Sequence, residues 1–416
     1  MRGILYNMSY RSFFGLKQKK KEELVLVLDV GNASVGGALV LLTPQDVPQI
    51  VFSTRSAITV SRTIHSSRLI QSLGNALERT LKDLNKNGMP HLVFTRRGKM
   101  IPRFVFCVFA APWHVSHLRA TAVSQPTSFE VTHDALSSIL QKELETSKNP
   151  QTKEYLRSGV EGDRMIFLEK EVVRITLNGY ETPKPFHRKT KKLESLFFVS
   201  MAPQDIIDLV KKKIERVFHI DDVRFHSFTL AFWNVVRGIW GVEKDYLLID
   251  ISGELSEISL VRDGALVETG TFPRGRNFFL RKIMSSFHVS IHEASSLLDL
   301  YFSGNLSNEV ADRFETILNE TKKEWLQNLK EALSRFSDGL FLPSHIFLAA
   351  DEPLAKLLMR VIQDGKWGVA TFTGEPFVVT LIGNEALANF SKTTSTRQDN
   401  FLIIDSLFAQ KLHFLE

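Results

Sequence analysis

The stretch VLVLDVGNASVGGALVLL, residues 25–42, constrains the fold more than any other part of the chain. An unbroken run of valine and leucine precedes Asp29, which is typical of a strand buried on both faces. A turn of small residues follows, made of Gly31, Asn32, Ala33 and Ser34. Such a turn lets backbone N–H groups approach an anion, and an acid beside it can hold a metal ion through water. The stretch therefore predicts a β-hairpin whose turn is either an anion site or an ordinary turn.

The same pattern returns past mid-chain in YLLIDISGELSEISLVRDGALVETG, residues 246–270. An apolar strand ends at Asp250, Ser252 and Gly253 form the turn, and a second strand follows. The dipeptide Asp263-Gly264 predicts a tight hairpin turn into a third strand. Two hairpins that each begin with an acid at the turn indicate two related halves facing one cleft.

On these two stretches the chain resembles the actin-like ATPase superfamily, and within it the bacterial FtsA and PilM branch. Residues 25–42 match the first phosphate loop of that family, and residues 246–262 match the second. The resemblance implies an α/β fold of two actin-like (ribonuclease H-like) lobes with a small inserted α+β subdomain.

The resemblance also implies ATP and Mg²⁺ as cofactors. Asp29 and Asp250 would position the metal through water, and the backbone amides of residues 31–34 and 252–254 would hold the phosphates. Ser256 and Glu293 match further nucleotide-binding positions of the family.

The family pattern divides the chain into five segments. These are a basic and aromatic leader at 1–23, a first lobe at 24–111, an inserted subdomain at 112–200, a return to the first lobe with a linker at 201–245, and a second lobe at 246–416.

Departures from the family pattern predict that nucleotide binding is weak or lost. Glu254 stands where the second phosphate loop has a glycine. A carboxylate about 4 Å from a phosphate oxygen repels it by about 4 kcal/mol at an effective dielectric near 20, unless the side chain points away or a metal ion intervenes. The glycine-rich turn that closes the adenosine pocket reads AADEP here, residues 349–353. No lysine follows Glu293 at the expected offset. The chain is therefore predicted to be a scaffold and not an enzyme.

Composition excludes several other classes. The single cysteine, Cys107, lies in the apolar run FVFCVFA, so there is no disulfide framework and a reducing cytoplasm fits. The net charge of +6 is too modest to indicate nucleic acid. His114 and His117 lack nearby acids in the sequence and are predicted to be surface residues. Residues 1–21 are either a solvated leader or a contact with the inner face of the cell membrane.

The resemblance implies a protein partner. In FtsA the inserted subdomain contacts neighbouring subunits, which here implies self-association; in PilM a peptide of a membrane partner docks by it. The basic loop of residues 184–192 is the predicted contact surface, its alternative being a solvated turn. The first functional reading is an FtsA-like scaffold in cell division. The alternative is a PilM-like platform for type IV pilus or secretion assembly, and a third is a small-molecule kinase of the same superfamily.

Overall fold

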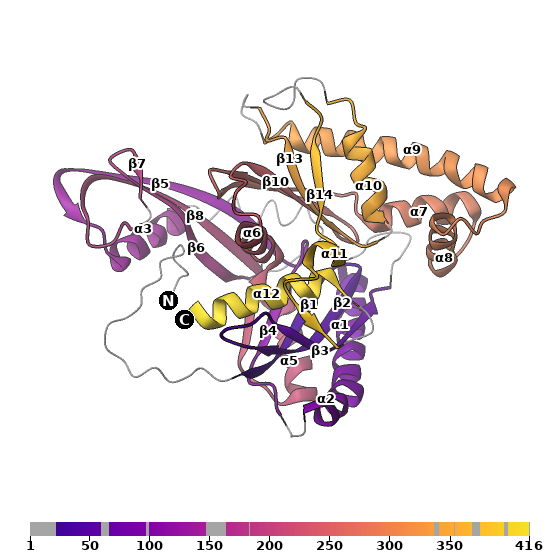
Figure 1. Cartoon of the computed structure of the whole chain (residues 1–416). Coiled ribbons are helices and arrows are strands. Elements are labelled where there is room, and N and C mark those ends of the chain that lie inside the picture. Colours follow the sequence, from indigo (N-terminus) through magenta and orange to yellow (C-terminus); the bar gives the residue numbers. More distant parts are fainter. Residues whose placement is uncertain are drawn as a thin grey trace.

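The computed structural model describes most of the chain. The described residues are 22–59, 66–96, 100–146, 164–182, 184–336, 341–352, 354–367, 375–394 and 398–415. The predicted leader therefore lies outside them except for its last two residues. The strands form three sheets, shown in Figure 1.

The first lobe is built on a six-stranded sheet in the order β15-β3-β2-β1-β4-β9. Its strands are β1 (Glu23–Val30), β2 (Ser34–Leu42), β3 (Gln49–Ala57), β4 (Val105–Phe109), β9 (Val223–Ser227) and β15 (Lys392–Thr393). β1 is antiparallel to β2 and parallel to β4, and nearly all its side chains are buried because helices cover both faces of the sheet.

The second lobe repeats this arrangement on a five-stranded sheet in the order β12-β11-β10-β13-β14. Its strands are β10 (Tyr246–Ile251), β11 (Ser256–Arg262), β12 (Ala265–Phe272), β13 (His345–Ala350) and β14 (Val378–Leu381). β10 is antiparallel to β11 and parallel to β13, as β1 is to β2 and β4. The predicted pair of hairpins, each with an aspartate near the end of its first strand, is confirmed. Asp29 in β1 and Asp250 in β10 occupy equivalent places.

The inserted subdomain is a four-stranded sheet in the order β5-β8-β6-β7 with one helix against it. Its elements are β5 (Val115–Glu130), α3 (His133–Thr146), β6 (Met165–Leu177), β7 (Tyr180–Glu181) and β8 (Lys189–Pro203). The buried carboxylate of Glu169 in β6 accepts hydrogen bonds from the backbone N–H and the hydroxyl of Ser227, both 2.8 Å long. This contact ties the subdomain to the first lobe.

Helices cover the two larger sheets. In the first lobe they are α1 (Ser66–Asp83), α2 (Met89–Arg96), α5 (Gln204–Phe218) and α6 (Phe228–Ile239). In the second they are α7 (Arg276–Phe287), α8 (Ile291–Phe302), α9 (Asn308–Leu333), α10 (Leu354–Gln363) and α11 (Asn384–Leu387). Among the described residues, none of the helices combines the length and apolarity that crossing a bilayer requires.

The dipeptide Asn87-Gly88, of a kind that often ends a helix, lies here in a π-helical turn (η1, Leu84–Gly88) that continues into α2. The amide of Asn87 donates to the Asp83 carboxylate four residues earlier, which keeps it in the helix. A Cβ on Gly88 would lie 2.8 Å from the Phe52 ring. This glycine therefore serves close packing on β3 and not helix termination.

The assignment of residues 246–416 to the second lobe is wrong for its last part. β15 pairs with β3, and the C-terminal helix α12 (Asn400–Leu415) packs on β1, β2 and α6 of the first lobe. The terminal run has the apolar composition of either lobe, so the sequence alone did not distinguish between them.

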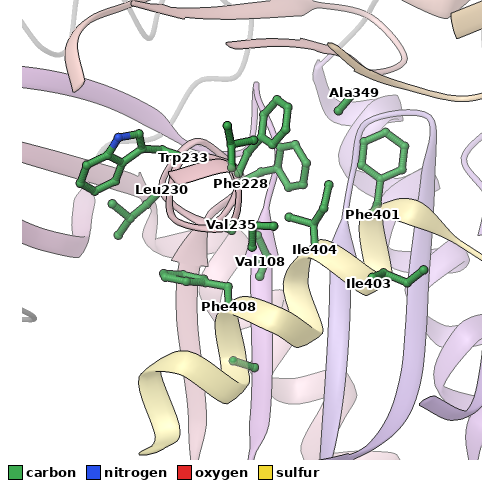
Figure 2. Close-up of a cluster of buried hydrophobic side chains, with 14 of the residues drawn as sticks. Val108, Phe228, Leu230, Trp233, Val235, Ala349, Phe401, Ile403, Ile404 and Phe408 are labelled. Atoms are coloured by element: carbon green, nitrogen blue, oxygen red, sulfur yellow. The ribbon is translucent and has the colours of Figure 1, made fainter. Parts of the chain in front are cut away.

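Helices α12 and α6 fill the space between the lobes. Figure 2 shows Phe401, Ile404 and Phe408 of α12 in one buried cluster with α6 and β4, and Ala349 of β13 in the second lobe lies at its edge. Because one continuous core includes residues from both sheets, the hydrophobic effect holds the two lobes together.

Truncating the buried ring of α12 will destabilise the whole chain. Phe408 is fully buried, with ring centroids 5.7 Å from Phe106 and 5.4 Å from His226. We expect Phe408→Ala to lower the free energy of unfolding by about 3–5 kcal/mol, measured by urea denaturation. The control Val242→Ala changes a side chain that is 94% exposed and should have almost no effect. A loss below about 1 kcal/mol for Phe408→Ala would contradict the shared core.

Candidate functional site

The turns of the two matching hairpins touch each other. The buried side chain of Asn32 lies between them: its amide donates to the Ser252 hydroxyl over 3.1 Å, and its Oδ1 accepts from the backbone N–H of Glu254 over 2.7 Å. The same amide also donates to the carbonyl of Ala111. One side chain of the first lobe therefore bonds both to the end of that lobe at Ala111 and to the second lobe.

Glycine at position 253 is required by this contact. A Cβ there would lie 2.4 Å from Oδ1 of Asn32 and 2.6 Å from the Cβ of Ala33. A Cβ on Gly275 would in turn lie 2.4 Å from the carbonyl oxygen of Gly253. The second turn is thus enclosed between the first turn and the N-terminus of α7.

Several backbone amides predicted to hold phosphates already have partners. The N–H of Gly31 donates to the carbonyl of Ser34 over 3.1 Å, and that of Ser252 donates to the carbonyl of Leu255 over 3.2 Å. The N–H of Glu254 donates to Asn32. Each would have to give up a hydrogen bond within the protein to bind an anion.

The side chain of Glu254 points away from the first turn, which is the case in which the predicted repulsion of a phosphate does not apply. Its carboxylate points to α7, where Arg281 binds both oxygens at 2.6 and 2.7 Å and Asn277 donates over 2.8 Å. A bidentate guanidinium neutralises the charge locally. Glu254 therefore fixes the second turn to α7 and does not face the first turn.

Asp29 is bound to an arginine that the sequence analysis did not select. Arg55 of β3 lies 2.6 Å from Asp29 and 2.6 Å from Asp399, and it donates to the Ser34 hydroxyl over 2.9 Å. This ion pair occupies the carboxylate of Asp29 that was predicted to position a metal ion through water. A charged residue within a strand was the only sequence signal for Arg55.

Asp250 lies buried without a hydrogen-bond partner for its Oδ1. Burial raises the pKa of Asp250 well above its usual range, and the nearby acids Glu257, Asp29 and Asp351 raise it further. Both effects favour the protonated form of this carboxyl. The described residues contain no group of three or more potential ligands placed to hold a metal ion. Metal binding by Asp29 and Asp250 stays a prediction.

The remaining predicted residues have structural contacts. The buried hydroxyl of Ser256 donates to the carbonyl of Arg274 over 2.9 Å, and so supports the loop before α7. Glu293 is exposed and forms a capping box with Ser290 at the start of α8, its carboxylate accepting from the Ser290 N–H over 2.7 Å. The carboxylate of Glu293 is therefore engaged in capping the N-terminus of α8.

His114 is not a surface residue. Only 2% of it is exposed, and its Nε2 lies 3.7 Å from the carboxylate of Glu257. Glu257 also accepts from the Thr229 hydroxyl over 2.6 Å. The acid that His114 lacks in sequence is supplied by β11, so this contact joins the inserted subdomain to the second lobe.

Comparison with solved structures identifies the fold. The chain is similar to a chain of the PilM-PilN type IV pilus biogenesis complex, with 15% identity, a TM-score of 0.59, and coverage of 94% of this chain and 98% of that one. The ethanolamine utilization protein EutJ from Carboxydothermus hydrogenoformans matches at 9% identity and TM-score 0.42, over 94% and 91% of the two chains. A Bacteroides thetaiotaomicron protein with an actin-like ATPase fold and unknown function matches at 9% and 0.40, over 90% and 95%. No family model and no curated protein matches the chain.

The predicted fold class is therefore confirmed: the chain has the two-lobed actin-like fold, with an inserted α+β subdomain.

The buried acid of the first turn makes stability depend on pH. Burial raises the pKa of Asp29 from 3.8 to about 6, although Arg55 acts against this. A carboxyl whose pKa is higher in the folded state stabilises the fold below its unfolded pKa, and that stability is lost as the pH rises through about 6. The shift corresponds to about 3 kcal/mol.

The test compares the wild type with Asp29→Asn in urea denaturation at pH 4, 5, 6 and 7. The unfolding free energy of the wild type minus that of the variant should fall by about 2.4 kcal/mol from pH 4 to pH 7, on top of a pH-independent offset from the lost Arg55 pair. Asp221→Asn, at an exposed site, is the matched control. A difference that stays constant with pH would refute the shifted titration.

Proposed function

We propose that this actin-fold chain is a PilM-like scaffold that binds a protein partner of a type IV pilus or secretion machine with its nucleotide cleft closed. The observation that carries the proposal is the contact of the two turns through Asn32, at 3.1 Å to Ser252 and 2.7 Å to the N–H of Glu254. In the family that this fold resembles, the nucleotide phosphates lie between those two turns.

A phosphate entering between the turns would have to displace Asn32. That step breaks hydrogen bonds to Ala111, Ser252 and Glu254, and each buried group left without a partner costs about 1–3 kcal/mol. Engaging Asp29 with a metal would also compete with its ion pair to Arg55. These costs lower the affinity for Mg·ATP and remove the basis for catalysis, which disfavours the small-molecule kinase reading.

Between the two scaffold readings, the structural comparison supports the pilus or secretion role. Similarity to the chain of the PilM-PilN complex extends over almost the full length of both chains, including the inserted subdomain. No observation favours the division role. In this proposal the inserted subdomain binds the partner, and the protein works at the cytoplasmic face of the membrane where that machine is assembled.

Mg·ATP should not stabilise the protein. A ligand that binds the folded state with a dissociation constant of about 10 µM would add about 2.7 kcal/mol at 1 mM, which thermal unfolding detects as a clear rise in Tm. We expect no rise in Tm for the wild type at 1 mM Mg·ATP, and an actin-fold ATPase in the same plate serves as the positive control. A rise in Tm at sub-millimolar nucleotide would contradict the proposal that the cleft is closed to nucleotide.

The partner assignment is tested by purifying the chain with its native partners. A tagged copy expressed from its own locus should retain inner-membrane components of a pilus or secretion system, identified by mass spectrometry, while a tag-only strain should not. Recovery of a filament-forming division protein without pilus or secretion components would instead support the division role.

A further inference from the structure

Basic side chains gather at one end of the inserted sheet, and we call this region the basic tip. It is made by the β6–β7 hairpin end and the chain that leads into β8. Its exposed members are Tyr180, Lys184, Arg188, Lys189 and Lys191. Figure 1 shows this sheet extending away from the two lobes, so the basic tip is the far end of a projecting element.

The basic tip is held in a defined shape. Oδ1 of Asn178, a hairpin residue in the left-handed conformation, accepts from the backbone N–H groups of Lys191 and Lys192 at 3.2 and 3.1 Å. The backbone of Arg188 accepts from the Val131 N–H over 2.9 Å, and the Phe186 ring stacks on His133 at 3.8 Å between centroids. The cations are therefore carried on an ordered hairpin end and not on a loose loop.

The charges of the basic tip are not balanced locally. The nearby acids have other partners: Glu130 pairs with His187 at 2.9 Å, and Glu194 pairs with Lys192 at 2.6 Å. Within the part of the chain that the structure describes, no acid lies within ion-pair distance of Lys184, Arg188, Lys189 or Lys191. Like charges held this close repel each other, and an external polyanion removes that repulsion.

Tyr180 gives the basic tip an amphipathic aromatic group. It is 80% exposed, on a two-residue strand beside the hairpin end. Tyrosine is enriched at the headgroup level of membranes because its ring prefers apolar surroundings and its hydroxyl prefers water. An exposed tyrosine beside lysines and arginines is the combination expected at an anionic bilayer surface.

We propose that the basic tip binds the headgroups of an anionic phospholipid bilayer, with Lys184, Arg188, Lys189 and Lys191 at the phosphates and Tyr180 at the interface. An anionic bilayer fits these groups because its phosphates match the cations and its interfacial layer matches the tyrosine. Single-stranded nucleic acid is bound in a basic groove lined by stacking aromatic rings, whereas here the Phe186 ring is already stacked on His133. The inference does not rest on the proposed pilus function.

The first experiment is vesicle co-sedimentation of the full chain. The test variant carries four substitutions at the tip: Lys184→Gln, Arg188→Gln, Lys189→Gln and Lys191→Gln. The matched control carries Lys86→Gln, Lys211→Gln, Lys212→Gln and Arg216→Gln, four exposed cations on η1 and α5. α5 follows the opposite end of β8, so the control removes the same charge far from the tip. Both variants keep residues 1–21, so the leader contributes equally to each.

We expect the wild type and the control to bind phosphatidylglycerol-containing vesicles, and the tip variant to bind them at least tenfold more weakly. Binding should weaken between 0.05 and 0.5 M salt and be absent on pure phosphatidylcholine. Equal binding by the tip variant and the control would overturn the proposal. If the tip variant instead lost binding to DNA or to an acidic peptide and kept its binding to vesicles, the proposal would also be overturned. The tip would then be assigned to that other partner.

The second experiment reports on the tip itself and does not depend on removing charge. Cys107 is the only cysteine of the chain and is fully buried in β4, so an introduced surface cysteine can be labelled selectively. A fluorophore at Tyr180→Cys should be quenched by brominated lipids in anionic vesicles, whereas one at Val242→Cys, on a residue that is 94% exposed, should not. Unquenched fluorescence at position 180, with the chain bound to the vesicles, would refute contact of the tip with lipid.

Discussion

The contact between the two hairpin turns is the interaction on which the rest of this structure depends. Asn32 satisfies groups on two segments, the carbonyl of Ala111 and the second turn at Ser252 and Glu254, and the absence of a side chain on Gly253 leaves room for this contact. The same positions that resemble a phosphate site are therefore used for adhesion between lobes. Together with the apolar core that α6 and α12 form between the sheets, this amide side chain joins the two lobes.

The buried aspartates on the two sides of that contact, Asp29 and Asp250, have different surroundings. Arg55 links Asp29 to Asp399, just before α12, and so connects the first turn to the C-terminal helix. On the other side, the described residues form no ion pair with Asp250, and burial together with neighbouring acids raises its pKa. A buried acid is stabilised by a cation or by its protonated form, and the two equivalent acids differ in which of these their surroundings favour.

Buried acids take part in attaching the inserted subdomain to both lobes, beside further contacts such as the Thr269 hydroxyl donating to the Ser116 carbonyl over 3.0 Å. Glu169 accepts from Ser227 of the first lobe, and Glu257 of the second lobe faces His114 and accepts from Thr229. Removing either acid would leave buried polar groups unsatisfied, so the subdomain has a defined position relative to the lobes. A projecting basic tip on a firmly attached subdomain is suited to contact with a surface outside the molecule.

The sequence by itself determined the two matching hairpins, because a buried strand, an acid and a small-residue turn are local patterns that repeat at residues 25–42 and 246–270. It also determined the inserted α+β unit and the eroded second turn. Only the tertiary structure decided that α12 belongs to the first lobe, that Glu254 faces Arg281, and that Arg55 and Asn32 occupy the cleft. These depend on contacts between residues far apart in the chain, and local periodicity carries no information on which distant partner a buried side chain meets.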